Sequence, residues 1–164
     1  MARKIQLYLN DRLETIEVDE NEILVDTLRE RFGLCGTKEG CRTGDCGTCT
    51  ILLDGTAVRS CLLLSCAVEG RHIVTIEGLG DAEHIHPIQQ AFIDAGAVQC
   101  GFCIPGMVLA AKSLLDKNHH PTEQEIRVAL SGNLCRCTGY EKIVRGVQLA
   151  EQYLFPRSIA DDRN

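Results

Sequence analysis

The cysteines of the segment GCRTGDCGTCT, residues 40–50, constrain this chain more than any other feature. Cys41, Cys46 and Cys49 follow the spacing C-x4-C-x2-C, and Cys61 comes after eleven further residues. Three thiols within nine residues must converge on one centre, so the loop that carries them has to turn sharply. We expect glycines to provide the turns through positive φ angles and to let backbone amides approach the sulfur atoms. These glycines are Gly36, Gly40, Gly44 and Gly47.

This spacing is the ligand pattern of a plant-type 2Fe-2S cluster. Amide groups aimed at the sulfurs stabilise such an anionic centre and raise its reduction potential. Structural zinc is an alternative, although zinc sites favour two pairs of close ligands over three close ligands and one distant one. A disulfide framework is a second alternative, but it requires an oxidising compartment. The apolar run after Met1-Ala2-Arg3-Lys4 is too short for a signal peptide, which argues against that compartment.

The composition restricts the class of protein. A chain of 164 residues can form one ordinary domain or two small ones. Its net charge of -6 and the lack of a basic run argue against a nucleic-acid partner. Charged residues such as Asp54 and Arg59 interrupt the most apolar region, so no membrane span is expected. Ten cysteines and only 4% aromatic residues suit an electron carrier, and we predict a soluble, cytoplasmic protein.

The first half of the chain has the pattern of a small β-grasp ferredoxin domain, predicted over residues 1–78. Apolar residues alternate over 5–9 and 16–18 around an Asn10-Asp11 turn, which predicts a β-hairpin. Helical spacing follows over 23–32 and ends at Gly33. A strand over 50–53, the type I′ turn signal Asp54-Gly55 and a returning strand bring Cys61 back to the loop. A last strand is predicted over 72–76.

The second half is predicted to be a four-helix bundle over residues 79–156, followed by a tail over 157–164. The helices are expected over 86–96, 105–118, 122–131 and 138–156. The third and fourth begin with a Thr followed three residues later by Glu, at Thr122 and Thr138, which is the pattern of a capping box. The fold class is therefore α+β, with a ferredoxin domain before a helical domain.

Four further cysteines fall in two connections of this bundle. Cys100-x2-Cys103 lies between the first and second helices, and Cys135-x-Cys137 lies between the third and fourth. These connections are at the same end of an up-down bundle, so the four thiols should meet there. Two helix N-termini would direct their positive dipole ends at them, which suits an anionic cluster. Zinc remains an alternative at this site, because the spacing is less diagnostic.

Three segments resemble the signatures of the iron-sulfur subunit of molybdenum hydroxylases, the family of xanthine, carbon monoxide and nicotinate dehydrogenases. The segments are KEGCRTGDCGTCT, QCGFCIPGM and SGNLCRCTGY, and the resemblance spans residues 4–154. It implies two 2Fe-2S clusters in this chain. Residues matching Gln99 and Cys137 contact molybdopterin in the family's large subunit. The implied ligands are Cys41, Cys46, Cys49 and Cys61 for the first cluster and Cys100, Cys103, Cys135 and Cys137 for the second.

The resemblance also implies a function. The chain would be the electron-transfer subunit of an oxidoreductase and would itself supply no catalytic residue. Electrons would pass from molybdopterin, in the cytosine dinucleotide form, on a large subunit to FAD on a medium subunit, in a dimer of heterotrimers. The substrate is expected to be a purine or another N-heteroaromatic compound. Alternatives are a free-standing ferredoxin, which has no need of the second domain, and a zinc or redox sensor.

A few residues depart from the pattern or have no role in it. Many members of the family have Thr where this chain has Ile104, and small or acidic residues are common where it has Arg42-Thr43. We expect these differences to tune the clusters rather than to alter their ligands. Cys35 and Cys66 are not part of either ligand set, and we expect both to be small buried hydrophobic residues.

Overall fold

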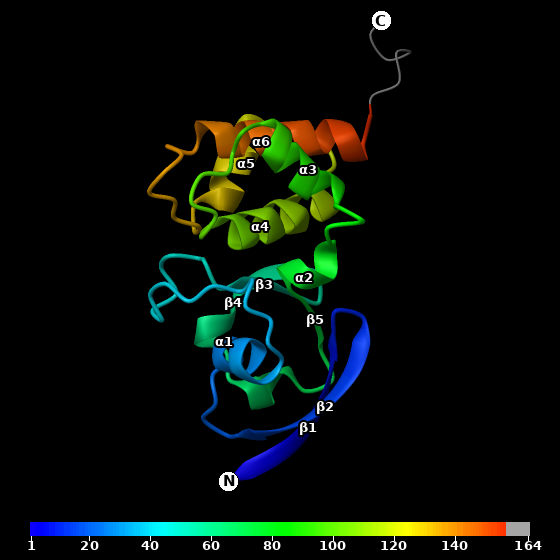
Figure 1. The fold of residues 1–164 in the computed structure, drawn as a ribbon, viewed down its shortest axis with the longest axis vertical. Coiled ribbons are helices and arrows are strands. Elements are labelled where there is room, and N and C mark those ends of the chain that lie inside the picture. Colours follow the sequence, from blue (N-terminus) through cyan, green and yellow to red (C-terminus); the bar gives the residue numbers. More distant parts are fainter. Residues whose placement is uncertain (157–164) are drawn as a thin grey trace, which may run out of the picture.

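The computed structural model describes residues 1–156, so the predicted tail over 157–164 lies outside the described residues. Figure 1 shows two lobes stacked along the long axis of the molecule, one with the strands and helix α1 and the other with helices alone. We call them the β lobe, which contains strands β1 to β5, and the helical lobe, which contains helices α2 to α6. The α+β architecture predicted from the sequence is confirmed.

The β lobe is built on a five-stranded mixed sheet with the order β2-β1-β5-β3-β4. Only β1 and β5 are parallel, and the other neighbours are antiparallel. Both predicted hairpin turns are present, because Asn10 and Asp11 in the first and Asp54 and Gly55 in the second have positive φ angles. The strands are β1 (Ala2–Leu9), β2 (Arg12–Asp19), β3 (Thr50–Leu53), β4 (Thr56–Arg59) and β5 (His72–Val74).

The helix that packs on this sheet is less regular than predicted. It begins as α1 (Leu24–Asp26) and continues as a π-helical segment, η1 (Thr27–Arg31). The Phe32 amide accordingly donates to the Thr27 carbonyl, five residues earlier, and Gly33 follows with φ +69° as a closing glycine. Two short 3-10 turns, η2 (Ser60–Leu62) and η3 (Ser65–Val68), complete the lobe. Its core joins the sheet to the helix through Ile5, Leu7, Leu24, Leu28, Ile51 and Ile73.

The last strand ends two residues earlier than predicted. β5 stops at Val74, and Ile76 begins a short helix, α2 (Ile76–Leu79). Ile76 and Leu79 pack against the core of the helical lobe, which explains why Ile76 leaves the sheet. Figure 1 shows α2 at the level where the two lobes meet.

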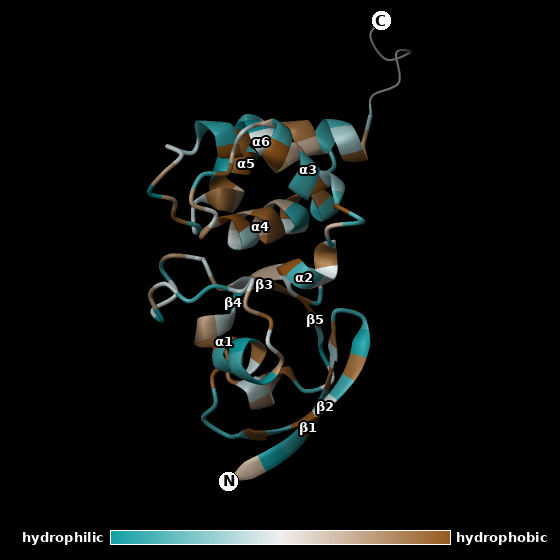
Figure 2. Cartoon of the chain, in the orientation of Figure 1, coloured by the Kyte–Doolittle hydropathy of each residue, from teal (hydrophilic) through white to brown (hydrophobic). Residues whose placement is uncertain are grey.

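The helical lobe contains the four predicted helices, α3 (Pro87–Asp94), α4 (Ile104–Lys117), α5 (Glu123–Leu130) and α6 (Glu141–Leu154). The capping box of α5 is confirmed, because Thr122 and Glu125 exchange hydrogen bonds with each other's backbone. Hydrophobic residues alternate with hydrophilic ones along the helices in Figure 2. The buried residues, including Phe92, Met107, Leu115, Ile126, Ile143 and Val147, form one core.

The predicted capping box of the fourth helix is wrong. α6 begins at Glu141, after Tyr140 in a left-handed conformation with φ +70°, and its N-terminus has no side-chain cap. The Thr138 hydroxyl instead accepts from the Tyr140 amide at 3.3 Å, before the helix begins, and donates to the Cys135 sulfur at 3.1 Å. The T-x-x-E pattern at this place therefore serves the cysteine loop and not the helix.

Helix α4 joins the two lobes by packing against β3 and β4. The Ser113 hydroxyl of α4 accepts from the Ala57 amide and donates to the Gly55 carbonyl, both at 3.1 Å. These bonds hold the second hairpin of the sheet against the helix. No helix in residues 1–156 combines the length and apolar character that a membrane crossing requires.

Candidate metal centres

The first cysteine set lies in the loop before β3 and in the turn after β4. The Cys41 sulfur accepts hydrogen bonds from the amides of Thr43 and Cys46, both at 3.4 Å. The Cys46 sulfur lies 3.2 Å from the Thr48 hydroxyl. Cys49 and Cys61 are buried together in a small hydrophobic cluster beneath the loop. The returning strand thus brings Cys61 to the loop, as the sequence pattern predicted.

The four loop glycines act in two different ways. Gly44 and Gly47 have φ angles of +86° and +70°, as predicted. Gly36 and Gly40 do not have positive φ angles, so that part of the prediction is wrong. A Cβ atom on Gly40 would lie 2.9 Å from the Cys46 sulfur, and one on Gly36 would lie 2.3 Å from Ile76. These two positions need glycine because neighbouring atoms approach too closely for a side chain.

The second cysteine set is assembled from two connections of the helical lobe. Cys100, Cys103, Cys135 and Cys137 line one cavity of about 410 Å³, together with Phe102, Leu134, Arg136 and Tyr140. The sulfurs of Cys100 and Cys137 are 3.6 Å apart. The predicted meeting of the two connections at one end of the bundle is therefore observed.

Cys135 is held by groups of its own loop. Its sulfur accepts from the hydroxyl and the amide of Thr138, at 3.1 and 3.4 Å. Its backbone amide donates to the Tyr140 hydroxyl at 2.9 Å. The left-handed backbone of Tyr140 thus returns its side chain towards the cysteine loop.

Hydrogen bonds and burial shift the pKa values of the thiols in each set in opposite directions. The Thr43 hydroxyl and the Cys46 amide lower the pKa of Cys41 to about 6. Burial raises the pKa of Cys61 to about 11 and that of Cys103 to about 12. For Cys135 burial acts against ionisation, but the Thr138 and Cys137 donors outweigh it and lower its pKa. Each set therefore combines a thiol that is prepared as a thiolate with one in an apolar surrounding, which a bound cation would have to ionise.

The eight thiols also form four contacting pairs. Cys41 contacts Cys46, Cys49 contacts Cys61, Cys100 contacts Cys137, and Cys103 contacts Cys135. Within residues 1–156, no three His, Cys, Asp or Glu side chains are grouped as ligands of a single metal ion. Two irons that share four thiolates take two each, so two pairs per set fit a 2Fe-2S cluster.

The two sets are joined by contacts that the sequence did not reveal. The Leu134 amide donates to the Cys46 carbonyl at 2.8 Å, and the Asn133 side-chain amide donates to the Gly47 carbonyl at 2.9 Å. A Cβ atom on Gly106 would lie 2.5 Å from that same carbonyl. The loop of the first set therefore lies directly against the segment that leads to Cys135. No local pattern marks these residues, because their partners come from the other lobe.

Comparison with known proteins agrees with this arrangement. Residues 7–75 match the sequence model of the 2Fe-2S iron-sulfur cluster binding domain, and residues 75–148 match that of the [2Fe-2S] binding domain. The chain is 50% identical to the nicotinate dehydrogenase small FeS subunit of Eubacterium barkeri, over 89% of this chain and 93% of the relative. It is also 50% identical to the nicotine 6-hydroxylase small subunit of Paenarthrobacter nicotinovorans, over 88% and 87%.

The chain belongs to the small iron-sulfur subunits of the molybdenum hydroxylases. Its fold matches a chain of quinoline 2-oxidoreductase from Pseudomonas putida 86, with a TM-score of 0.88, 42% identity and coverage of 96% of this chain and 99% of the other. It also matches the aldehyde oxidoreductase of Desulfovibrio gigas, with a TM-score of 0.92, 39% identity and coverage of 98% of this chain but 18% of that one. This small iron-sulfur subunit is thus part of an oxidoreductase.

The residues expected at molybdopterin lie on the surface of the small iron-sulfur subunit. Gln99 and Cys137 are exposed, and Gln99 directly precedes Cys100, which contacts Cys137. Exposed apolar side chains surround them, namely Val98, Phe102 and Leu134. An exposed rim of this kind around a cysteine set is suited to contact with another protein chain.

The two unassigned cysteines differ from each other. Cys66 packs against the core of the β lobe but is half-buried, so the prediction of a buried residue is met in part. Cys35 is exposed, so the prediction of a buried residue is wrong. It lies in the irregular segment after Gly33.

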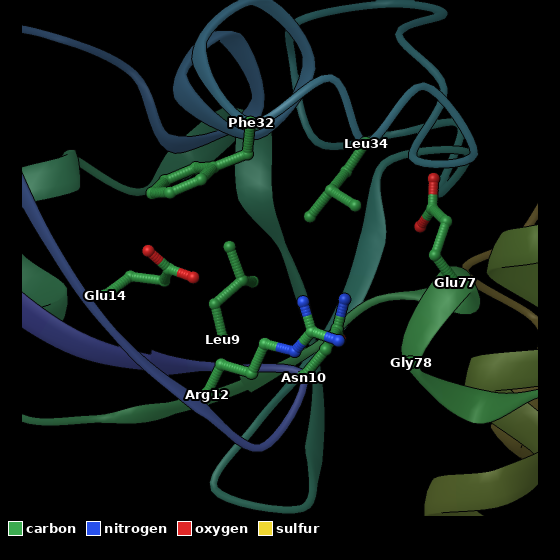
Figure 3. A pocket seen from close by; sticks show the side chains of 8 residues that line it. All are labelled: Leu9, Asn10, Arg12, Glu14, Phe32, Leu34, Glu77 and Gly78. Carbon is green, nitrogen blue, oxygen red and sulfur yellow. The ribbon is translucent and has the colours of Figure 1, made fainter.

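A separate cavity of about 420 Å³ lies between the first hairpin, the segment after η1 and α2. Figure 3 shows Leu9, Phe32 and Leu34 directed into it and Arg12 at its rim. No cysteine lines this cavity, so it is distinct from both cysteine sets.

Proposed function

We propose that this chain holds two 2Fe-2S clusters and is the electron-transfer subunit of a molybdenum hydroxylase complex. Its domains would comprise residues 1–78 and 79–156. When bound, the clusters supply one-electron carriers between a molybdopterin centre and FAD. The proposed ligands of the first cluster are Cys41, Cys46, Cys49 and Cys61, and those of the second are Cys100, Cys103, Cys135 and Cys137.

The hydrogen bond from the Leu134 amide to the Cys46 carbonyl is the observation that carries this proposal. It joins a residue of the first ligand set to the neighbour of Cys135 in the second, over 2.8 Å. Two carriers fixed side by side serve transfer in series between two partners. A free-standing ferredoxin would need only one exposed cluster, so the rigid pair favours a subunit of a larger complex.

The exposed groups suggest which set faces which partner. Gln99 and Cys137 are proposed to contact molybdopterin of a large subunit, with Val98, Phe102 and Leu134 as the surrounding contact surface. The Cys41 set would then face FAD on a medium subunit. We further propose a cytoplasmic dimer of such heterotrimers and the cytosine dinucleotide form of molybdopterin.

The substrate of the complex is proposed to be an N-heteroaromatic compound. Three similar proteins are named for nicotinate, nicotine and quinoline, which are all compounds of this class. Because the substrate pocket would lie in the large subunit, the sequence of the co-purifying large chain is the direct test of this part.

Metal analysis and electron paramagnetic resonance (EPR) of the purified complex test the central proposal. We expect about four iron and four sulfide per copy of this chain, and two distinct 2Fe-2S signals after reduction. Rapid mixing with substrate should reduce the second set first, and freeze-quench EPR follows that order. A colourless chain with bound zinc would contradict the proposal, and early reduction of the Cys41 set would reverse the proposed order.

A further inference from the structure

Arg59 occupies an unusual position between the two lobes. It ends β4, two residues before Cys61, and its guanidinium reaches across to the helical lobe. Nη2 donates to the Gly132 carbonyl at 2.6 Å, and Nη1 donates to the Thr50 hydroxyl at 3.1 Å. Its Nε is fully buried without a hydrogen-bond partner. The contact is tight, since a Cβ atom on Gly132 would lie 2.1 Å from Nη2.

Among residues 1–156, Arg59 has no carboxylate partner, because its hydrogen bonds go to a carbonyl and a hydroxyl. Arg42 provides the contrast, since it is exposed and forms ion pairs with Asp26 and Glu39. Arginine keeps its charge in proteins, and Arg59 is half-buried, so part of its charge is removed from water at a cost that a counter-charge would offset. The surroundings of Arg59 therefore imply an anion that protein side chains do not provide.

The neighbours of Arg59 connect it to both cysteine sets. Gly132, which accepts from Nη2, lies three residues before Cys135. Thr50, which accepts from Nη1, directly follows Cys49 and also accepts from Asn133 at 3.1 Å. One guanidinium is thus placed within a few residues of ligands from both sets.

We propose that Arg59 is the shared counter-charge of the two clusters and that it raises both reduction potentials. This inference rests on the proposed function in one respect, namely that both sets hold 2Fe-2S clusters. A cluster with four thiolates is dianionic when oxidised and trianionic after it gains one electron. A nearby fixed cation stabilises the trianion more than the dianion, because attraction grows with the charge. Because Arg59 is half-buried, salt screens this attraction less than it would at a fully exposed charge.

The test is a potentiometric titration of the intact complex, with EPR following each cluster separately and dithionite supplying the electrons. Two neutral variants, Arg59→Gln and Arg59→Met, should shift both midpoint potentials to more negative values. Arg59→Lys keeps the charge and should leave both potentials close to those of the natural chain. Arg42→Gln is the matched control, because that arginine follows a ligand directly but is exposed and already paired. It should shift the potential of the Cys41 set less than Arg59→Gln does, and leave that of the other set unchanged.

Several results would overturn the inference. Unchanged potentials in the neutral variants would do so, and so would a shift confined to one cluster. Equal shifts in Arg59→Lys and Arg59→Gln would also do so, since they would indicate lost hydrogen bonds and not lost charge. If neither neutral variant loads both clusters, Asn133→Asp places a negative charge beside Arg59. Both potentials should then fall, and two unchanged values overturn the inference.

Iron content and the EPR signals distinguish a wrong role for Arg59 from a wrong proposed function. If the natural chain lacks two 2Fe-2S signals, the proposed function is wrong and the inference is wrong with it. If both signals are present but their potentials do not respond to the charge at position 59, only the role of Arg59 is wrong.

Discussion

The two cysteine sets reach similar chemistry by different routes. Three of the four thiols in the first set lie within nine residues, so a single loop creates most of the site. The second set is divided between two connections that are 31 residues apart, and helix packing brings them together. The first site is therefore encoded locally, while the second exists only when the helical lobe is folded.

The sets are more alike in the groups that surround the sulfurs. In each, one sulfur accepts hydrogen bonds from its own loop, at Cys41 from Thr43 and at Cys135 from Thr138. In each, a deeper thiol has its pKa raised by burial, at Cys61 and at Cys103. The difference between the sets thus lies in how they are assembled and not in how they hold sulfur.

Removing one ligand from each set gives the largest expected effect. Cys46→Ser should abolish the EPR signal of the first set and leave that of the second, and Cys103→Ser should do the reverse. The physical reason is that each cluster needs four thiolates, and no thiol is shared between the sets. EPR and iron analysis of the reduced complex make the measurement. If either variant lost both signals while still folded, the division of ligands would be wrong.

Destabilising the core of the helical lobe should give the next largest effect, and it should affect the two cysteine sets differently. Phe92→Ala removes a fully buried ring of α3, with an expected cost of about 3–5 kcal/mol. The second set should lose iron, because its two connections depend on this core for their positions, while the first set keeps its signal. Ile93→Ala, at the exposed neighbouring position, is the control. Equal loss of iron from both sets would show that the first set also depends on the helical lobe.

The same distinction explains what the sequence could predict. The turns at Gly44 and Gly47 in the first loop, both hairpin turns and the Thr122 capping box depend on near neighbours in the chain, and all were predicted. The errors have two sources. Ile76 leaves its strand because it packs against the core of the other lobe. Thr138 does not cap its helix because its hydroxyl serves a cysteine of its own loop, three residues earlier. The roles of Arg59 and Asn133 could not be predicted, because their partners lie 73 and 86 residues away.

A glycine substitution at the contact between the lobes tests how closely the sets are joined. Gly47→Ala places a Cβ atom 2.2 Å from the Gly132 carbonyl, at a residue with φ +70°. Gly70 has a similar φ of +73° but no described atom within 4 Å of such a Cβ, so Gly70→Ala carries the backbone strain alone. That strain costs about 1–3 kcal/mol, and Gly47→Ala should cost more. Thermal unfolding compares the stability of the two variants. Equal losses of stability would show that the contact between Gly47 and the Gly132 carbonyl can relax.

The smallest expected effect is that of acid on the stability of the β lobe. The Glu22 carboxylate accepts from the Thr27 hydroxyl at 2.6 Å, the Asp19 amide at 3.3 Å and Arg31 at 2.5 Å. Burial raises its pKa, but these donors outweigh burial and lower the pKa below the usual 4.5. The stability from Glu22 is therefore fully present above about pH 4.5 and is lost as the pH falls through its lower folded-state value.

Glu22→Gln should consequently unfold at a lower urea concentration than the natural chain at pH 7. The loss in free energy of unfolding should be less than about 1 kcal/mol, because the Arg31 partner is partly exposed. The difference should begin to shrink as the pH falls below about 4.5, since the natural chain then starts to lose the same interaction. Acid also weakens bound clusters, but it does so in both chains and cancels in the difference. Glu20→Gln, at an exposed position two residues earlier, is the control. A difference that stays constant from pH 7 to 4 would show that Glu22 acts through packing, and that the β lobe owes no stability to this charge.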